Sequence, residues 1–418
     1  MKRIKKLLCL LLSLSMLAGL CTGCGNSAGQ KEKAKKIGIS MPNDSDARWS
    51  ADSEALHDIL TAAGYEVNIQ FAGNDAAAQV QQIQDMIGAG CTTIIAAAVD
   101  SSRLAADLAL EDTDRQRISG GSAEDEAEDT AHSPIDDELN LIAYQTLIAD
   151  SGIVDYYVGF DGYEAGYLQA SCIEDMLSLA DATSTYNLEL FFGDPNDPLT
   201  AFQYQGAMEV LQVYIDSGVL SISSGQTALE NVCSASADDA KTRMENLLSS
   251  TYAAGGLDAV LCADDTLARA VGNTLFDRYA GGVFPILTGQ GCLEQNVNDL
   301  VSGRQSMTLL DDCTGMTAEA ARVAIALSSG ENVDTDDSLD NGRINVPASL
   351  FYPQAVYADS ITDLLVTPGY FAANGDGSYK AVMPYTAQKG DSTADQTSPD
   401  GTTSNAASSA CASTGGET

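Results

Sequence analysis

The sequence predicts two α/β lobes, each built on a doubly wound parallel sheet with helices on both faces. From Ile37 onward, short apolar runs alternate with longer amphipathic segments, which is typical of such sheets. The same alternation begins again at Ile153, so the architecture occurs twice. The length of 418 residues matches about two domains, and 44% hydrophobic residues are enough for two packed cores.

The first repeat contains four expected strands and two expected helices. Val80, Ile83 and Ile87 fall on one face of a helix, and residues 50–63 form a second amphipathic helix that ends before Gly64. The expected strands are residues 36–40, 66–71, 92–97 and 139–144.

The second repeat follows the same order of strand and helix. Its expected strands are residues 154–158, 188–192, 259–262 and 285–288. Its expected helices lie near residues 166–179, 201–217, 240–252 and 267–279.

The N-terminus predicts export and lipid attachment. Four basic residues precede an apolar run from Leu7 to Leu20 that is too short to span a membrane, which indicates a signal peptide over residues 1–23. The segment from Cys21 to Cys24 resembles a bacterial lipobox, so Cys24 is the expected lipid anchor and residues 24–36 the tether. The alternative is an ordinary secretory signal in which the cysteine is accidental.

Charge and composition exclude several classes of function. The net charge is -38, and removal of the four basic residues of the signal peptide takes it to -42, so we expect no nucleic-acid partner. None of the eight remaining cysteines forms a CxxC pair, which favours buried free thiols over disulfides or a zinc site. With only His57 and His132, a histidine-based metal or catalytic centre is not expected, and no cofactor is predicted.

Two segments are predicted to lie outside the packed cores. Residues 112–138 are expected to be a disordered acidic insertion. A calcium loop is the alternative there, but the acids lack the alternate spacing around a glycine that such a loop uses. Residues 389–418 contain no Ile, Leu, Val, Met or aromatic residue, so this tail is predicted to be disordered.

A series of short segments, in order along the chain, resembles one known family. The segments are residues 37–42 (IGISMP), 48–49 (RW), 64–67 (GYEV), 79–83 (QVQQI), 95–100 (IAAAVD), 154–158 (VDYYV), 206–212 (GAMEVLQ), 224–227 (SGQT) and 287–290 (LTGQ). They are similar to landmarks of the multiple-sugar-binding receptors among the type I periplasmic binding proteins, relatives of the xylose, arabinose and galactose receptors. The likeness covers about residues 36–371, apart from the acidic insertion.

This resemblance implies a domain division. It implies two lobes joined by three crossovers, with a ligand in the cleft between them. We expect an N-terminal lobe of residues 37–146 and 291–330, and a C-terminal lobe of residues 147–290 and 331–388. The hinges are then expected near residues 147–151, 289–291 and 345–348.

Candidate ligand-binding residues follow the ends of the predicted strands, because ligands of open parallel sheets lie outside the carboxyl ends of strands. A sugar needs an aromatic ring against its C–H face and polar groups for its hydroxyls, which Trp49, Arg48 and Asp100 offer. The alternative for each is structural: packing for the Trp, a solvated Arg and a helix cap for the Asp. The full candidate set is Asp44, Arg48, Trp49, Asp100, Gln145, Asn196, Asp265 and Gln290, with Asp194, Asp197 and Asp264 as further candidates.

Three positions depart from the family pattern. The family's Tyr-Asp-Arg appears as Tyr144-Gln145-Thr146, its Gly-Gln-Asp as Gly289-Gln290-Gly291, and a lysine as Asp311. These departures imply a pocket with fewer polar side chains than in the family. A different or less hydroxylated ligand therefore remains an alternative.

The N-terminal signal and this resemblance together predict a monomeric, lipid-anchored receptor on the outer face of the cytoplasmic membrane. It is expected to deliver a monosaccharide to an ABC permease and, indirectly, its ATPase, without enzymatic activity. Alternatives are a receptor that presents ligand to a membrane sensor kinase, a binder of a non-sugar solute, and a secreted hydrolase with paired carboxylates. A transcription regulator of the same fold would carry a helix-turn-helix before Ile37, where this chain has the predicted signal peptide.

Overall fold

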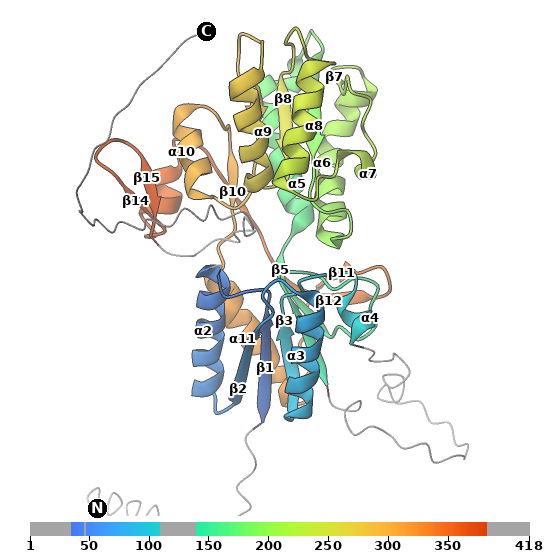
Figure 1. Ribbon diagram of the computed structural model, residues 1–418, viewed down its shortest axis with the longest axis vertical. Coiled ribbons are helices and arrows are strands. Elements are labelled where there is room, and N and C mark those ends of the chain that lie inside the picture. The colour runs from blue at the N-terminus through green and yellow to red at the C-terminus, as the bar shows by residue number, and fades with distance from the viewer. Residues whose placement is uncertain (1–34, 46, 109–138, 383–418) are drawn as a thin grey trace, which may run out of the picture.

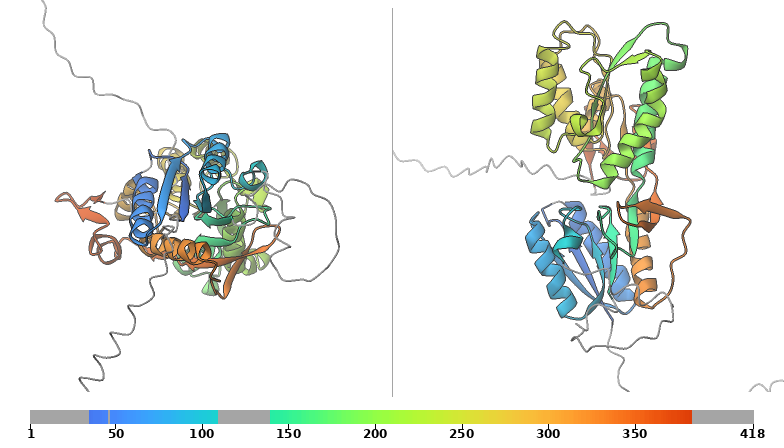
Figure 2. Two further views of the ribbon diagram at one scale, coloured as in Figure 1. Left: turned by 90° about the horizontal axis from the view of Figure 1, so that it is seen from below. Right: turned by 90° about the vertical axis from the view of Figure 1, so that its right-hand side faces the viewer.

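The computed structural model describes residues 35–45, 47–108 and 139–382. These residues form two lobes, one above the other in Figure 1. Figure 2 shows that the lobes are joined along one side, where the chain passes between them. Cys24, the acidic insertion and the C-terminal tail lie outside the described residues. Within the described residues, no helix is long and apolar enough to cross a membrane.

The first lobe is built on a seven-stranded sheet in the order β11-β12-β5-β4-β3-β1-β2. All neighbouring strands are parallel except β11 and β12. The strands are β1 (Lys36–Met41), β2 (Glu66–Phe71), β3 (Cys91–Ala96), β4 (Asn140–Tyr144), β5 (Tyr156–Phe160), β11 (Asp337–Asp340) and β12 (Asn345–Phe351). The four strands expected in the first half of the chain are thus confirmed to within one residue at each end.

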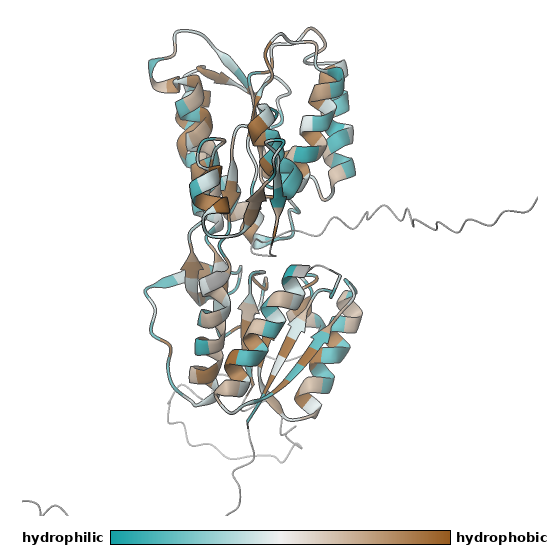
Figure 3. Cartoon of the chain, turned by 90° about the vertical axis from the view of Figure 1, so that its left-hand side faces the viewer, coloured by the Kyte–Doolittle hydropathy of each residue, from teal (hydrophilic) through white to brown (hydrophobic). Residues whose placement is uncertain are grey.

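Helices cover both faces of this sheet, because its strands are apolar on both sides. One face packs against α2 (Ala47–Ala62) and α11 (Thr314–Ser328), through Leu56, Leu60 and Met316. The other packs against α3 (Ala76–Gly88) and the short α4 (Leu104–Asp107), through Ile83 and Met86. Figure 3 shows the brown apolar residues concentrated in the strands and along the helix faces that contact them.

The second lobe has a smaller parallel sheet in the order β7-β6-β8-β9. Its strands are β6 (Tyr186–Phe191), β7 (Leu220–Ser221), β8 (Ala259–Cys262) and β9 (Ile286–Leu287). Its helices are α5 (Gly162–Leu177), η2 (Leu179–Asp181), α6 (Pro198–Asp216), α7 (Leu229–Val232), α8 (Ala237–Ser249), α9 (Asp265–Arg278) and α10 (Glu294–Ser302). The predicted helices and the strands β6, β8 and β9 are confirmed, with ends that differ by a few residues.

Helices α5 and α6 cross in direct backbone contact, which fixes the side chains near the crossing. A Cβ atom on Gly166 would lie 1.8 Å from the Gln203 carbonyl oxygen, and one on Gly206 would lie 1.9 Å from the Tyr163 oxygen. Only glycine permits this approach. One turn from these glycines, Gln169 and Gln203 are brought side by side.

The chain crosses between the lobes at three places, and these differ from the predicted hinges. The crossovers lie between β5 and α5, between β10 (Thr308–Leu310) and α11, and between β12 and β13 (Gln354–Val356). Strands β10 and β13 pair antiparallel beside the junction. Figure 1 shows α10 and β10 with the upper lobe and α11 with the lower.

The predicted lobe boundaries at residues 146, 290 and 330 are therefore wrong. Strand β5 pairs with β4 and β12, so the first lobe continues to Phe160 before the chain leaves. Residues 345–348 lie inside β12 of the first sheet and are no hinge. After β13, the chain adds η3 (Thr362–Val366) and the hairpin of β14 (Phe371–Ala373) and β15 (Tyr379–Ala381), which pack against α10 in a small cluster of their own.

Candidate functional site

Helix α2 begins where β1 ends, and it brings a buried charged group to the junction of the lobes. Arg48 is 1% exposed, and its Nε lies 3.3 Å from Oδ2 of Asp52, one turn further along the helix. The hydroxyl of Tyr144, at the end of β4, donates to the same oxygen of Asp52 at 2.9 Å. Both Asp52 and Tyr144 are buried, so this group is fixed in the first lobe.

The surroundings of Arg48 keep its guanidinium charged. Burial alone would lower the pKa of Arg48, but Cys313, Asp52, Tyr144 and Asp311 together raise it above its ordinary value. Burial raises the pKa of Cys313 to about 12, so this thiol is neutral at physiological pH. The charges that act on Arg48 there are the carboxylates of Asp52 and Asp311.

The second lobe presents a ladder of glutamine amides. The Gln169 amide nitrogen donates to the carbonyl oxygens of Cys262, Ala263 and Gly289, each at 3.1 Å. The Gln203 amide nitrogen donates to Oε1 of Gln169 at 3.1 Å and to Oε1 of Gln290 at 3.2 Å. The ladder ties the ends of β8 and β9 together and leads from the interior of the lobe to Gln290.

Asp311 joins the ladder to the charged group. It lies in the crossover from β10 to α11 and is 2% exposed. The Gln290 amide nitrogen donates to both of its oxygens, at 2.9 and 3.1 Å. Together with its electrostatic interaction with Arg48, these bonds make a polar chain across the junction: Gln169, Gln203, Gln290, Asp311, Arg48, Asp52 and Tyr144.

Gln145 lies at this junction in a backbone conformation that is unusual for its residue type. Its φ angle is 63°, and such strain is typical of functional positions. Its amide nitrogen contacts Sδ of Met316 at 3.4 Å and Sγ of Cys313 at 3.8 Å, close in sequence to Asp311. The structure therefore brings three predicted site residues, Arg48, Gln145 and Gln290, around the crossover that contains Asp311.

Trp49, Asp100 and Asp44 lie at the same strand ends but are less enclosed. Trp49 is half-buried against the first-lobe core, and the guanidinium carbon of Arg48 lies 4.7 Å from the centroid of its ring. Asp100 follows β3 and caps a turn through Ser102, while Asp44 is exposed.

Asn196 meets the opposite lobe through its backbone. Its carbonyl oxygen accepts a hydrogen bond of 3.2 Å from the Ser101 hydroxyl, next to Asp100. Its side-chain amide instead donates to Asp194 within its own loop. The loops after β3 and β6 therefore face each other across the junction.

Asp265 lies in a hydrogen-bond network inside the second lobe. It is 1% exposed, and its oxygens accept hydrogen bonds from Gln305 at 2.8 Å, Thr308 at 2.9 Å and the Leu293 backbone at 2.9 Å. Burial raises its pKa to about 7 against these hydrogen bonds. These contacts tie α9 to α10 and β10 inside the second lobe, and the role of Asp265 as a ligand contact stays a prediction.

Five members of the polar chain were not predicted as site residues: Asp52, Tyr144, Gln169, Gln203 and Asp311. The glutamines carry a signal in the sequence, because each interrupts the buried face of an amphipathic helix, and a buried amide needs partners. Asp52 lies one helical turn after Arg48, the spacing of an ion pair.

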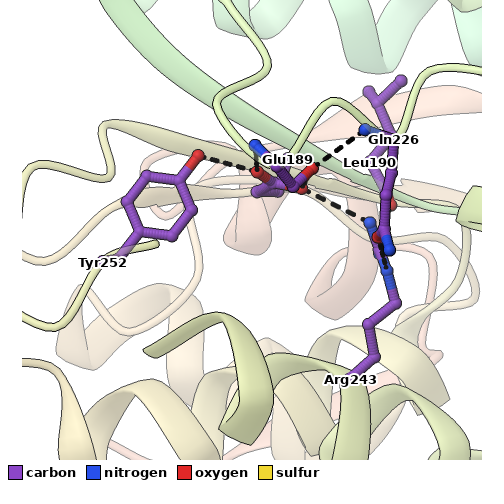
Figure 4. Close-up of polar contacts among 6 residues, drawn as sticks. Glu189, Leu190, Gln226, Arg243 and Tyr252 are labelled. Atoms are coloured by element: carbon purple, nitrogen blue, oxygen red, sulfur yellow. Dashed lines mark hydrogen bonds and ion pairs between the residues drawn. The ribbon is translucent and has the colours of Figure 1, made fainter. Parts of the chain in front are cut away.

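A second polar cluster lies in the second lobe, away from this chain. Glu189 is fully buried in β6 and accepts a hydrogen bond from the hydroxyl of Tyr252 at 2.7 Å (Figure 4). It accepts a second from the hydroxyl of Ser224 at 2.8 Å. Arg243 lies 3.3 Å from Glu189 and donates to the Leu190 carbonyl oxygen.

This cluster provides a hydrogen-bond partner for the backbone of β6 where no neighbouring strand does. Strand β7 pairs only with Tyr186 and Asn187, so Arg243 supplies the partner that the Leu190 carbonyl would otherwise lack. A pocket of about 440 Å³ opens beside it, between α8 and the loop after β7, but none of its lining residues belongs to the polar chain. We interpret this cluster as structural support.

The thiols fit the predicted pattern of free cysteines. Of the six cysteines in the described residues, five are buried, Cys233 is partly exposed, and none is in a disulfide. His57 is partly exposed beside Asp58, whereas His132 lies outside the described residues.

Comparison with known proteins identifies relatives of this arrangement. The model of a periplasmic binding protein domain matches residues 37–111 and 128–332. The multiple sugar-binding periplasmic receptor ChvE of Rhizobium radiobacter is 34% identical over 345 residues, which cover 81% of this chain and 91% of the relative. The multiple sugar-binding periplasmic protein SbpA of Azospirillum brasilense is 33% identical over 370 residues, covering 85% and 96%.

A solved structure agrees with these relatives. An ABC transporter solute-binding protein from Clostridium phytofermentans, with bound β-D-glucose, is 36% identical with a TM-score of 0.69. The match covers 81% of this chain and 98% of that one.

Proposed function

Since this chain belongs to the periplasmic binding protein family, with the type I fold, we propose that it is an extracytoplasmic receptor that binds a monosaccharide between its lobes. We further propose that it delivers the sugar to an ABC permease and its ATPase, that it acts as a monomer, and that it binds without catalysis. Two relatives named as multiple sugar-binding proteins and a glucose-bound structure support the sugar as ligand.

The observation that carries this proposal is the polar chain across the junction. The ends of β1, β3 and β4 from one lobe and of β6, β8 and β9 from the other converge there, where open parallel sheets bind ligands. Amides and carboxylates are the groups that exchange hydrogen bonds with sugar hydroxyls. Because these groups are buried, their hydrogen bonds to a ligand would be stronger than the same bonds in water.

The proposed contacts follow from this placement. Gln290 and Asp311 offer hydrogen-bond partners from the second lobe and the crossover, and Arg48 and Gln145 offer them from the first. Trp49 is proposed to lie against the apolar face of the sugar, with Asp100, Asn196 and Asp44 at the rim. Lobe closure about the three crossovers would then enclose the ligand.

A thermal-shift screen of the full chain against monosaccharides tests this function. A ligand that binds only the folded state at a hundred times its Kd raises the free energy of unfolding by about 2.7 kcal/mol. We expect at least one hexose or pentose to raise the Tm in proportion to the logarithm of its concentration. Unchanged melting with every monosaccharide in the panel would contradict sugar binding.

Anchoring is proposed to occur through Cys24. Two acyl chains on this cysteine would hold the protein at the outer face of the cytoplasmic membrane, because each buried methylene contributes about 0.8 kcal/mol. The substitution Cys24→Ala is expected to release the protein from the membrane fraction. An acylated Cys24→Ala protein in that fraction would show that the anchor lies elsewhere.

A further inference from the structure

A buried phenol connects a loop of the first lobe with the first crossover. Tyr157 of β5 is fully buried, and its hydroxyl lies 3.2 Å from the carbonyl oxygen of Gln145 and 3.3 Å from that of Phe160. A phenol has one proton to donate, so the two carbonyls share it. Gln145 follows the end of β4, and Phe160 is the last residue of β5 before the chain crosses to α5. The Tyr157 hydroxyl therefore links the backbone of Gln145 to the crossover.

A glycine makes room for this phenol. Tyr157 and Gly159 are two residues apart on one strand, so they lie on the same face of the sheet. A Cβ atom on Gly159 would lie 2.2 Å from the Tyr157 hydroxyl oxygen and 2.4 Å from its Cζ. Any larger residue at position 159 would displace the phenol. Gly159 therefore allows the ring to lie along its own strand and reach both carbonyls.

The backbone of Gln145 needs this support. Its φ angle of 63° is strained for a residue other than glycine, and such a conformation persists only where the surroundings hold it. The Gln145 N–H donates to the Val158 carbonyl oxygen at 2.8 Å, and the Gln145 carbonyl accepts from Tyr157. Both polar backbone groups of Gln145 are thus held by β5, which fixes the direction of its side chain.

The side chain of Gln145 points toward the start of α11 and has only weak partners there. Its amide nitrogen contacts Sδ of Met316 at 3.4 Å and Sγ of Cys313 at 3.8 Å. Sulfur is a weak hydrogen-bond acceptor, so a sugar oxygen can replace these contacts at little cost. Gln145 is also partly exposed, whereas Tyr157 is not.

We propose that Tyr157 is a positioning residue for ligand binding, whose hydroxyl holds Gln145 in the backbone conformation that presents its amide to the sugar. This inference rests on the proposed function, in which Gln145 contacts the ligand, and adds a residue that acts through Gln145. The ring of Tyr157 packs in the core beneath one face of the first sheet. Removal of the hydroxyl alone therefore leaves that packing in place.

Two matched substitutions of Tyr by Phe test this inference. Tyr157→Phe removes the hydroxyl that contacts Gln145. Tyr156→Phe removes the hydroxyl of the preceding residue, which is also buried but lies on the opposite face of the sheet, 3.0 Å from Oγ of Ser349. We would titrate the full chain by calorimetry with D-glucose, D-galactose, D-xylose and L-arabinose. For each sugar that binds, we expect Tyr157→Phe to raise the Kd about three- to tenfold and Tyr156→Phe less than about twofold.

A double-mutant cycle shows whether Tyr157 acts through Gln145. Gln145→Gly removes the side chain and accepts the positive φ angle without strain. In that background, Tyr157→Phe is expected to change the Kd by less than about twofold, because no side chain is left to position. Gly159→Ala keeps the hydroxyl but displaces it, so it is expected to weaken binding as Tyr157→Phe does. It provides the same test where Tyr157→Phe does not fold.

The outcomes separate this inference from the proposed function. An unchanged Kd in a folded Tyr157→Phe or Gly159→Ala variant would overturn the positioning role and leave sugar binding intact. An equal rise of the Kd in Tyr156→Phe, or the full rise in the Gln145→Gly background, would do the same. No binding of any of the four sugars to the unmodified chain, together with a thermal-shift panel without any response, would overturn both proposals.

Discussion

The two lobes meet the junction with different chemistry. The first lobe brings charges, in Arg48 and Asp52, whereas the second brings the neutral amides of Gln169, Gln203 and Gln290. Amide ladders tie strand ends together at little electrostatic cost, while a buried ion pair is stable only while every member is present. From this difference we infer that the amides of the second lobe hold the strand ends in place. The charged residues of the first lobe provide the electrostatic interactions at the junction.

The largest expected effect on stability comes from a change to the charged residues of the first lobe. Arg48→Met removes the positive charge that stabilises the buried carboxylates of Asp52 and Asp311. These two negative charges then remain in the interior without that cation. We expect the free energy of unfolding to fall by about 3 to 5 kcal/mol in urea denaturation. The control is Arg103→Met, which breaks an exposed ion pair with Asp107 at 2.8 Å and is expected to cost less than about 1 kcal/mol. Equal losses in the two variants would show that burial of Arg48 is not what matters.

A smaller effect on stability is expected from a change to the glutamine ladder of the second lobe. Gln169→Met keeps the side-chain volume but removes the donor to three buried carbonyl oxygens, so unfolding should become easier by about 1 to 3 kcal/mol. Gln212→Met, at an exposed position of α6, provides the control and is expected to change stability little. A Gln169→Met protein as stable as the parent would remove the structural role of the ladder.

Asp265 sharpens the comparison, because it is a buried carboxyl in the amide-rich lobe. Its pKa is about 7 in the folded protein, raised by burial, against 3.8 as the ordinary value. The folded state therefore binds the proton more tightly than the unfolded chain. The stability that this group contributes is complete below about pH 4 and is lost as the pH rises through 7.

Urea denaturation across this range tests the assignment. The stability advantage of the parent over Asp265→Asn is expected to shrink steadily from pH 4 to pH 7, because the amide does not titrate. Parallel stability curves for the two proteins would mean that Asp265 titrates normally.

Much of the fold could be predicted from the sequence, but the lobe boundaries could not. Apolar runs such as residues 36–41 are long enough and flanked clearly enough to predict strands. Nothing in the periodicity shows which sheet a strand joins, so the pattern predicts a strand close to the position of β5 but places it in the wrong lobe. The pairing of β5 with β12 joins residues that are almost 200 positions apart, which no local pattern reports.

Site residues could be predicted only where a polar or charged side chain directly follows the end of a predicted strand. Arg48 and Gln290 follow strand ends and lie in the polar chain. Asp265 follows a strand end as well, but its partner Thr308 lies 43 residues away, and only the fold shows that this carboxyl is already satisfied. Asp311 lies in a crossover, and its importance comes from the two lobes that meet there.

Trp49 allows the most direct test of ligand binding at this junction. It is the only tryptophan in the chain, it lies half-buried at the start of α2, and Arg48 stacks near its ring. Titration of the full chain with the sugar that raises its Tm should give a saturable change in tryptophan emission, with the Kd that calorimetry measures. Calorimetric binding of that sugar without any change in emission would place the ligand away from Trp49 and contradict a site between the lobes.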